Sequence, residues 1–250
     1  MNPVQQATDF TVIIPTKARP ALLERALRTV LAQTYPSFKV IVVDDGDGEG
    51  LEVAARLGDR RIAATSSDRA GQVAARKLGV TLAIGRWITF LDDDDWWEGQ
   101  GHLRALADVL ERTPGGQPVL AYGSGVMVEE GTGARLPFEA RADWQSIRHD
   151  NTILVSSMAY PLPLHAQLGT FDAALPYYWD WDWYLRLAAA KVPFEVASSA
   201  AARITCHPGS VSSDARAAER QANLETMRLK HGLGELKLKN HLSIAIERQG

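Results

Sequence analysis

The amino-acid sequence predicts an α/β fold with a Rossmann-like, mostly parallel sheet and helices on both of its faces. Continuous β-branched runs in the first hundred residues alternate with segments of helical periodicity. Strands that are apolar on both faces are typical of parallel β-α-β units, whose sheet is covered on both sides. The second half is less regular, with a hairpin signal and shorter strands, and predicts a mixed region of the same domain.

The first half contains four expected strands and three expected helices. The strands are expected at residues 11–14, 38–43, 61–65 and 86–91. The helices are expected at residues 21–31, 51–57 and 73–84. Parallel sheets bind ligands at the carboxyl ends of their strands, so polar residues that follow these strands are candidates for a site. Turn chemistry would also place Asp and Gly there.

The second half begins after a helix expected at residues 102–112. Further strands are expected at residues 118–128, 153–159 and 201–206, a hairpin turn at 129–133, and helices at 162–168 and 183–190. The last stretch is helical, rich in charge and interrupted at Gly232 and Gly234. We divide the chain into a donor-binding half at 1–112, an acceptor-binding and catalytic-base half at 113–213, and a helical extension at 214–250.

Composition is that of an ordinary globular enzyme. The 250 residues carry 27 Lys and Arg against 30 Asp and Glu, a net charge of -3, which argues against a general nucleic-acid or polybasic membrane binder. The single cysteine, Cys206, excludes an internal disulfide. The polar N-terminus has no signal-peptide pattern, and no apolar stretch approaches the roughly 18 residues that span a bilayer. We expect a cytoplasmic protein.

Four consecutive carboxylates, Asp92 to Asp95, follow the apolar strand expected at 86–91. Like charges in a row repel one another, and a divalent metal that carries an anionic ligand would neutralise them. Residues two apart on extended backbone point the same way, so Asp92 and Asp94 can serve one ligand together. A solvated acidic turn, or Asp95 as a helix N-cap, would explain the same pattern.

Several segments together resemble the inverting glycosyltransferases of family 2, which have the GT-A fold. In the first half, the resemblance is carried by the opening strand with Pro15 and Thr16, by Val42-Val43-Asp44-Asp45-Gly46, by Gly71 with Ala75-Arg76 and Gly79, and by Phe90-Leu91-Asp92 with Asp94-Asp95-Trp96. In the second half, it is carried by Asn151 to Ser157, by Gly169-x-Phe171-Asp172 and by Asp180-x-Asp182 with Arg186. Two positions depart from the family pattern: Lys77 stands where Asn is usual, and Trp179 stands where Glu is usual.

The resemblance implies a nucleotide-sugar site at the sheet edge. Asp94 would bind a divalent metal, Mn or Mg, that bridges the two phosphates, and His207 would complete that metal site. Asp92 would hold the ribose or the donor sugar. The other nucleotide-sugar contacts would come from Pro15, Thr16, Asp44, Asp45, Arg76 and Asp93. A carboxylate beside the base can accept from the imide N–H of uracil or thymine, which favours a UDP- or dTDP-sugar.

The resemblance also implies a catalytic base, Asp180, and a structural role for Asp182. A helix that begins near Asp182 would stabilise the ionised carboxylate of Asp180 through its positive end. The flanking tryptophans favour the neutral acid by desolvation, and a carboxylate balanced between these effects can accept a proton near neutral pH. Either aspartate could instead be an N-cap, and His207 could be a packing or surface residue.

The resulting expectation is a metal-dependent, inverting transfer of a single sugar from a nucleotide diphosphate sugar to a hydroxyl of an acceptor that the sequence does not identify. A catalytically inactive nucleotide-sugar-binding subunit and a nucleotidyltransferase are the alternatives. A dehydrogenase is disfavoured because no Gly-x-Gly-x-x-Gly follows the first strand. The 214–250 extension is a candidate for covering the acceptor site, for forming a homodimer or for touching a membrane surface.

Overall fold

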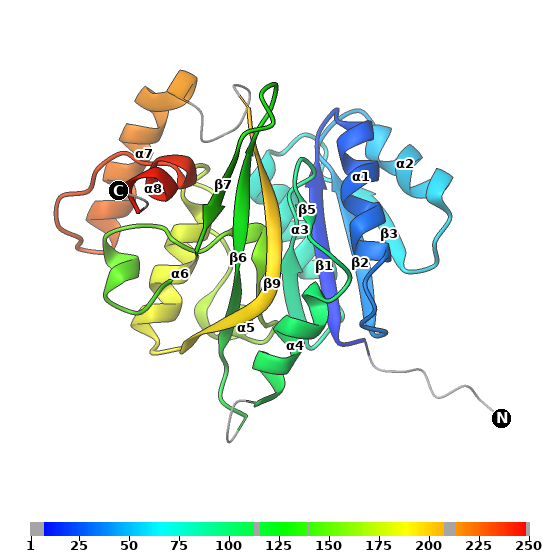
Figure 1. Cartoon of the computed structure of the whole chain (residues 1–250), viewed down its shortest axis with the longest axis horizontal. Helices are drawn as coiled ribbons and strands as arrows, with labels where there is room; N and C mark the ends of the chain where they lie inside the picture. Colours follow the sequence, from blue (N-terminus) through cyan, green and yellow to red (C-terminus); the bar gives the residue numbers. More distant parts are fainter. Residues whose placement is uncertain (1–7, 113–115, 140, 208–213, 249–250) are drawn as a thin grey trace.

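A computed structural model describes residues 8–112, 116–139, 141–207 and 214–248 of the chain. One nine-stranded sheet runs through the molecule in the order β3-β2-β1-β4-β8-β6-β9-β5, with β7 paired to β6 (Figure 1). The α/β architecture expected from the sequence is therefore confirmed. Residues 1–7, which form most of the polar N-terminus expected to have no signal-peptide pattern, lie outside the described residues.

The first half contains the expected alternation of strands and helices. Its elements are β1 (Phe10–Thr16), α1 (Pro20–Leu31), β2 (Phe38–Asp44), α2 (Glu49–Leu57), β3 (Ile62–Ser66), α3 (Gln72–Leu82), β4 (Trp87–Phe90), β5 (Trp96–Trp97) and α4 (His102–Arg112). The strands β3, β2, β1 and β4 are parallel to one another, so their carboxyl ends lie at one edge. The register pairs Thr16 with Asp44 at that edge.

Both faces of this parallel sheet are buried. Phe10, Val12 and Ile14 of β1 pack on the side of α1 and α4, whereas Ile13 packs on the opposite side with α3. Helix α3 approaches β1 closely because Gly79 has no side chain, and a Cβ atom there would lie 2.5 Å from Ile13 Cγ2. The continuous apolar run of β1 follows from this double burial.

The second half is mixed, as expected. Its elements are β6 (Leu120–Glu129), β7 (Arg135–Phe138), the 3-10 turns at Ser146–Arg148 and Val155–Ser157, β8 (Met158–Pro161), α5 (Leu164–Leu168), α6 (Trp179–Ala189), β9 (Phe194–Cys206), a 3-10 turn at Asp214–Arg216, α7 (Ala217–Lys230) and α8 (His241–Glu247). Strand β8 is antiparallel to both β4 and β6, and β6 is parallel to β9. The hairpin between β6 and β7 is confirmed.

Three expectations for this half are wrong in their boundaries. The strand expected at 201–206 begins earlier, as β9 starts at Phe194. The strand expected at 153–159 is a 3-10 turn at Val155–Ser157 followed by β8. Helix α6 begins at Trp179, not near Asp182, and its first turn buries the side chains of both Trp179 and Trp181. Asp180 therefore lies inside the first turn of the helix.

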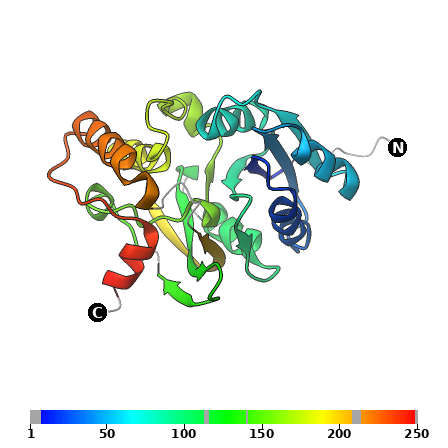
Figure 2. The same cartoon turned by 90° about the horizontal axis from the view of Figure 1, so that it is seen from above.

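The C-terminal extension packs beside α6, on the side of the molecule away from α1 and α2 (Figures 1 and 2). Lys230 Nζ lies 2.7 Å from Asp182 Oδ1, and His231 Nε2 lies 2.7 Å from the same oxygen. Arg186 adds a contact to the other oxygen of Asp182 at 3.0 Å. Asp182 thus ties the end of α7 to α6, which fits its expected structural role. Of the helices in the described parts, none combines the length and apolarity needed to cross a bilayer.

Candidate active site

A cavity of about 480 Å³ lies at the carboxyl edge of the parallel strands. It brings together residues that are far apart in the sequence. The predicted site residues among those that line it are Pro15, Thr16, Asp45, Arg76, Asp92, Asp93, Asp94 and Asp180. The edge of the sheet thus faces the first turn of α6 across one space, which can hold a donor and an acceptor together.

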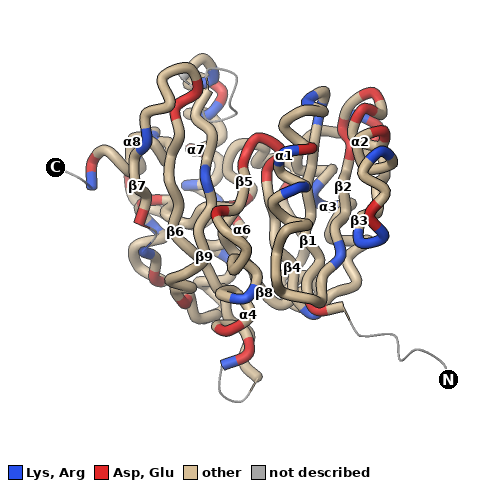
Figure 3. Tube along the Cα trace, turned by 45° about the vertical axis from the view of Figure 1, so that its right-hand side comes forward, with Lys and Arg blue, Asp and Glu red and all other residues tan. Residues whose placement is uncertain are grey.

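The aspartate run splits into two pairs. Asp92 forms an ion pair with the buried guanidinium of Arg76, and Asp94 Oδ2 accepts from Arg19 Nη1 at 2.6 Å. Both carboxylates remain at the cavity. Figure 3 shows the acidic stretch in red where it leads into β5. Cationic partners surround these carboxylates, as the repulsion within the run requires.

Asp93 and Asp95 hold the loop that carries the other two. Asp93 Oδ2 accepts from Thr16 Oγ1 at 2.7 Å, and burial, together with the charges of Asp94 and Asp92, raises the pKa of Asp93 to about 6. Asp95 Oδ2 accepts from Ser156 Oγ at 2.6 Å. Burial also raises the pKa of Asp95 well above its ordinary value. Asp95 does not cap α4, because that helix begins at His102.

Asp94 and His207 could hold a divalent metal. His207 Nε2 lies 3.1 Å from Asp94 Oδ2. Two ligands at about 2.1 Å from one Mg²⁺, at right angles, would be about 3 Å apart, so the pair fits one cation. No cluster of three or more His, Cys, Asp or Glu side chains suited to a metal occurs among the described residues. Such a metal would therefore need oxygens from a ligand, as Mg²⁺ commonly does with phosphates.

The adjacent residues Asp44 and Asp45 have different surroundings. Both oxygens of Asp44 are used by the backbone, since Oδ1 accepts from Gly46 N and Oδ2 from Gly50 N, each at 2.6 Å. Asp44 is 1% exposed and does not line the cavity, so it holds the loop after β2. Asp45 does line it: Oδ1 accepts from Ser67 Oγ at 2.7 Å, and Oδ2 lies 3.8 Å from the exposed Lys17 amine.

Asp180 is a half-buried carboxylate that lines the cavity. Asn151 Nδ2 donates to its Oδ2 atom at 2.8 Å. Burial raises the pKa of Asp180 to about 6, against the opposing effects of Asn151, two backbone N–H groups of the first helical turn and the charge of Arg76. The balance between desolvation and helix-end stabilisation expected from the sequence is present, and it gives a carboxylate able to accept a proton near neutral pH.

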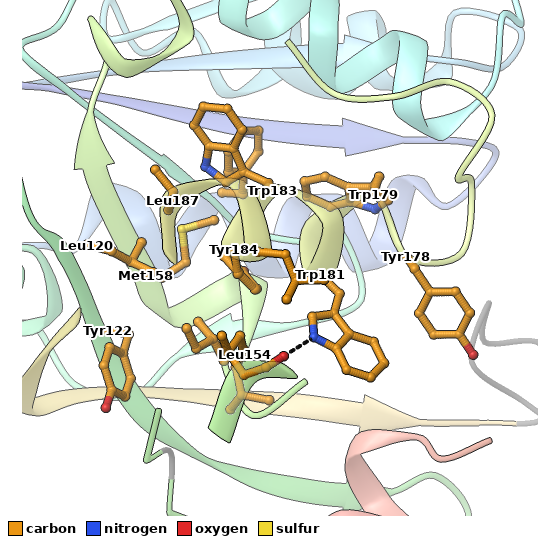
Figure 4. Close-up of a cluster of buried hydrophobic side chains, with 14 of the residues drawn as sticks. Leu120, Tyr122, Leu154, Met158, Tyr178, Trp179, Trp181, Trp183, Tyr184 and Leu187 are labelled. Atoms are coloured by element: carbon orange, nitrogen blue, oxygen red, sulfur yellow. Dashed lines mark hydrogen bonds between the residues drawn. The ribbon is translucent and has the colours of Figure 1, made fainter. Parts of the chain in front are cut away.

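The aromatic residues of α6 fix the position of Asp180. Figure 4 shows Trp179, Trp181 and Trp183 extending from α6 in different directions. Trp181 Nε1 donates to the carbonyl of Ile147 at 2.6 Å. Trp179 packs edge-on against Phe171, with ring centroids 4.8 Å apart. With these anchors on both sides, the Asp180 side chain is held at the cavity wall.

Arg76 connects the two halves of the site. Its guanidinium lies 4.6 Å from the centre of the Trp179 ring and pairs with Asp92, and its charge partly opposes the rise that burial causes in the pKa of Asp180. Trp179, which replaces the glutamate usual in the resembled family, thus supplies a buried aromatic platform for this arginine. Arg76 is 4% exposed, so it belongs to the cavity wall and is not a surface residue of α3.

Two polar residues of the site were not singled out from the sequence. Arg19 spans Asp93 and Asp94 from the start of α1, and its position shortly after Pro15 and Thr16 was the available signal. Asn151 begins one of the segments that carry the resemblance, but the sequence assigns it no role. Its contact with Asp180, 29 residues away, depends on the packing of α6 against the turn at Ser146–Arg148.

Comparison with known proteins gives the same family. The model of "Glycosyl transferase family 2" matches residues 11–155. The Bacillus subtilis protein named "Uncharacterized glycosyltransferase YwdF" is 33% identical over 238 residues, covering 92% of this chain and 87% of the relative. A Mycobacterium tuberculosis "PGL/p-HBAD biosynthesis glycosyltransferase" is 30% identical over 183 residues, covering 71% of this chain and 68% of the relative.

Solved structures share the fold. S. aureus TarS 1-349 in complex with UDP-GlcNAc superposes with a TM-score of 0.67 at 16% identity, covering 89% of this chain and 66% of that one. Its complex with UDP gives a TM-score of 0.64 at 18% identity, covering 91% and 68%. The chain therefore belongs to glycosyl transferase family 2, has the GT-A fold and is an enzyme that transfers glycosyl groups.

Proposed function

We propose that the protein transfers a single sugar from a nucleotide diphosphate sugar to an acceptor hydroxyl, with inversion at the anomeric carbon and with a divalent metal, Mn or Mg. The observation that carries the proposal is the placement of Asp92, Asp94 and Asp180 around one cavity. The first two suit a metal-bound diphosphate, and the last suits a hydroxyl that must lose its proton.

The donor is proposed to be a UDP- or dTDP-sugar. TarS, whose fold this chain shares, has been solved with UDP-GlcNAc and with UDP. In this chain Asp45 lines the cavity next to Pro15 and Thr16, and its Oδ2 atom can accept from a pyrimidine imide N–H. Arg19 and Arg76 are the nearby cations that can contact the diphosphate.

The transfer needs one proton acceptor and no covalent enzyme intermediate. Asp180 takes the proton of the acceptor hydroxyl as that oxygen forms a bond to the anomeric carbon. The bond from the anomeric carbon to the diphosphate oxygen breaks on the opposite face, and the electron pair leaves with the nucleoside diphosphate. A metal held by Asp94 and His207 would supply Lewis-acid stabilisation of the charge on the leaving diphosphate. Asn151 keeps Asp180 oriented through its hydrogen bond.

Neither alternative function has a specific observation in its favour. An inactive binding subunit would be favoured if Trp179, which stands where Glu is usual, disrupted the site; instead Trp179 packs in the cavity wall and leaves Asp180 lining the same space. Family membership and the named glycosyltransferase relatives support glycosyl transfer.

Donor binding tests the proposal first. Thermal unfolding is measured with UDP-, dTDP-, GDP- and ADP-sugars, in Mn²⁺ and in EDTA. A bound donor at a hundred times its Kd should add about 2.7 kcal/mol to the free energy of unfolding, and the effect should need the metal. NMR of the transfer product should then show inversion. A product with retained configuration, or no donor stabilising the protein in either condition, would overturn the proposal.

A further inference from the structure

The C-terminal extension contributes a distinctly basic wall to the acceptor side of the cavity. Its charged residues that line the cavity are Arg216, Arg220, Lys237 and Lys239. None of the acidic side chains described in this extension lines the cavity. Glu219 is bonded to the hydroxyl of Tyr177, and Glu225 pairs with Arg228 at 2.6 Å. The wall is therefore of one sign, although the chain as a whole is slightly acidic.

The four cations differ in their surroundings. Lys239 is neutralised by Asp150 at 3.1 Å and by Glu247 at 2.7 Å. Arg216 and Lys237 are exposed and have no carboxylate within 4.0 Å among the side chains that the structure describes. Arg220 is 3% exposed, with Nη2 donating to the Lys239 carbonyl at 2.6 Å. A guanidinium so far from water is costly unless it interacts strongly with its surroundings.

Two buried polar atoms near Asp180 point to a ligand on the same side. Asn151 Oδ1 and His241 Nε2 each lack a hydrogen-bond partner among the described residues, and both residues line the cavity. Buried polar atoms in folded proteins are nearly always paired, so unpaired ones in a cavity wall are explained by a polar molecule that binds there. Asn151 donates to Asp180, and Lys239 of the wall pairs with the adjacent Asp150, so the wall lies on the same side of the cavity as the proposed base.

We propose that the acceptor is a hydroxyl compound carrying a phosphate group, which the wall of Arg216, Arg220 and Lys237 binds while Asp180 faces the hydroxyl. This inference rests on the proposed function for the role of Asp180. Several cations from separate elements suit a phosphate, whose oxygens accept from more than one donor at once. A neutral sugar would make no ion pair with Arg216 or Lys237, neither of which pairs with a described carboxylate.

Binding of glycerol 1-phosphate tests the wall directly. The protein is first saturated with UDP and Mn²⁺, so that the donor side is filled, and binding is then followed by tryptophan fluorescence. Glycerol 1-phosphate should bind at least about tenfold more tightly than glycerol. Arg216→Gln and Lys237→Gln should each weaken its binding by about threefold to tenfold. Arg248→Gln is the matched control, because Arg248 belongs to the same extension but does not line the cavity.

A second pair of probes tests whether the phosphate belongs to a lipid headgroup or to a water-soluble or polymer-borne compound. Vesicles of phosphatidylglycerol are compared with vesicles of phosphatidylcholine, on the wild type and the same variants. Binding to phosphatidylglycerol that depends on Lys237 supports a lipid headgroup, and binding of glycerol 1-phosphate alone supports a water-soluble or polymer-borne phosphate. Both support phosphate recognition by the wall. Equal binding of glycerol and glycerol 1-phosphate, or an equal loss in Arg248→Gln, would overturn the inference.

The same experiment separates this inference from the proposed function. Failure of UDP and Mn²⁺ to bind counts against the proposed donor site, while the wall is still tested by glycerol 1-phosphate on the unloaded protein. Normal donor binding with no preference for the phosphate compound counts against the wall alone. In a turnover assay, a phosphate-bearing acceptor should have a lower KM than its neutral counterpart, and Lys237→Gln should raise that KM and leave donor KM unchanged.

Discussion

The side-chain amide of Asn151 donates to the Asp180 carboxylate at 2.8 Å, and this contact sets how readily the proposed base gives up its proton. The amide stabilises the ionised form of a carboxylate whose pKa burial has raised to about 6. Asn151 also orients Asp180 towards the cavity. Two properties of one base, its orientation and its protonation, therefore depend on one neighbour.

The first prediction concerns the pH dependence of transfer. A base works only when deprotonated, so kcat/KM should rise with pH and level off above about pH 6, the pKa of Asp180. In Asn151→Ala the ionised form loses a donor, so the rise should move to higher pH. Initial rates across a pH series check this. A flat profile from about pH 5 to about pH 8 in both proteins would contradict the assignment of the base.

The second prediction concerns the neighbours Asp44 and Asp45. Asp45→Asn should raise the KM for the donor by about tenfold or more, because it alters an acceptor proposed to contact the nucleotide base. Asp44→Asn should instead lower the free energy of unfolding by about 1–3 kcal/mol, since one of the two backbone N–H groups loses its partner. Donor KM and thermal unfolding are measured for both variants. A larger donor effect in Asp44→Asn would reverse the assignment.

The third prediction concerns the metal. Asp94→Asn should raise the Mn²⁺ concentration for half-maximal activity by about tenfold or more, because it removes a charged ligand. His207→Ala should have a smaller effect in the same direction. Asp95→Asn is the control: its carboxylate bonds Ser156 and the backbone of Thr205, so stability should change and the Mn²⁺ requirement should not. Full activity of the wild type in EDTA would contradict the proposal that transfer requires a divalent metal.

The fourth prediction concerns the attachment of the C-terminal extension. Burial opposes ionisation of Asp182, but His231, Lys230 and Arg186 outweigh it and lower the pKa of this carboxyl. The folded state thus favours the ionised form. This stabilisation is present above the ordinary pKa of an aspartate, 3.8, and is lost as pH falls through the lower folded value.

Asp182→Asn should accordingly cost about 3 kcal/mol at neutral pH, and the difference from the wild type should shrink below about pH 4. Asp172→Asn is the matched control, because Asp172 also pairs with Lys230 but is a third exposed. Its loss should be below about 1 kcal/mol. Urea unfolding at several pH values measures both. Equal losses in the two variants would show that burial of Asp182 adds nothing.

The sequence predicted those parts of the molecule where the pattern is local. The apolar runs of β1, β2 and β4 are buried on both faces, and such runs are visible without tertiary information. Helix α6 was placed too late because nearly all of its residues are buried, so the sequence has no polar face to show the helical period. The first part of β9 was missed because its Ala and Ser residues carry little strand signal.

The site was predicted less completely than the fold. Asp92, Asp94, Arg76 and Asp180 meet in one cavity as expected. Asp44 holds the loop and Asp45 lines the cavity because the backbone N–H groups of Gly46 and Gly50 donate to Asp44. The sequence does not distinguish two adjacent aspartates in this way. The basic wall comes from residues spread over the extension, and only folding gathers them on one side.

The fifth prediction uses Asp180→Asn, with a stability control built in. The pKa of Asp180 lies near 6, above its ordinary value of 3.8, so the folded protein favours the protonated carboxyl. The contribution of Asp180 to the free energy of unfolding thus falls as pH rises from about 4 to about 6, and it stays at that lower level above pH 6. The amide does not titrate, so Asp180→Asn should be at least as stable as the wild type at pH 7.5. A loss of activity in this variant would then not be explained by unfolding.

The most direct measurement is the rate of sugar transfer by Asp180→Asn under saturating donor, alongside its affinity for that donor. The account predicts that donor affinity stays within about twofold of the wild type, while kcat falls by about a hundredfold to ten-thousandfold, the contribution of a general base. Transfer at more than about a tenth of the wild-type rate, with donor affinity unchanged, would contradict the assignment of Asp180 as the base.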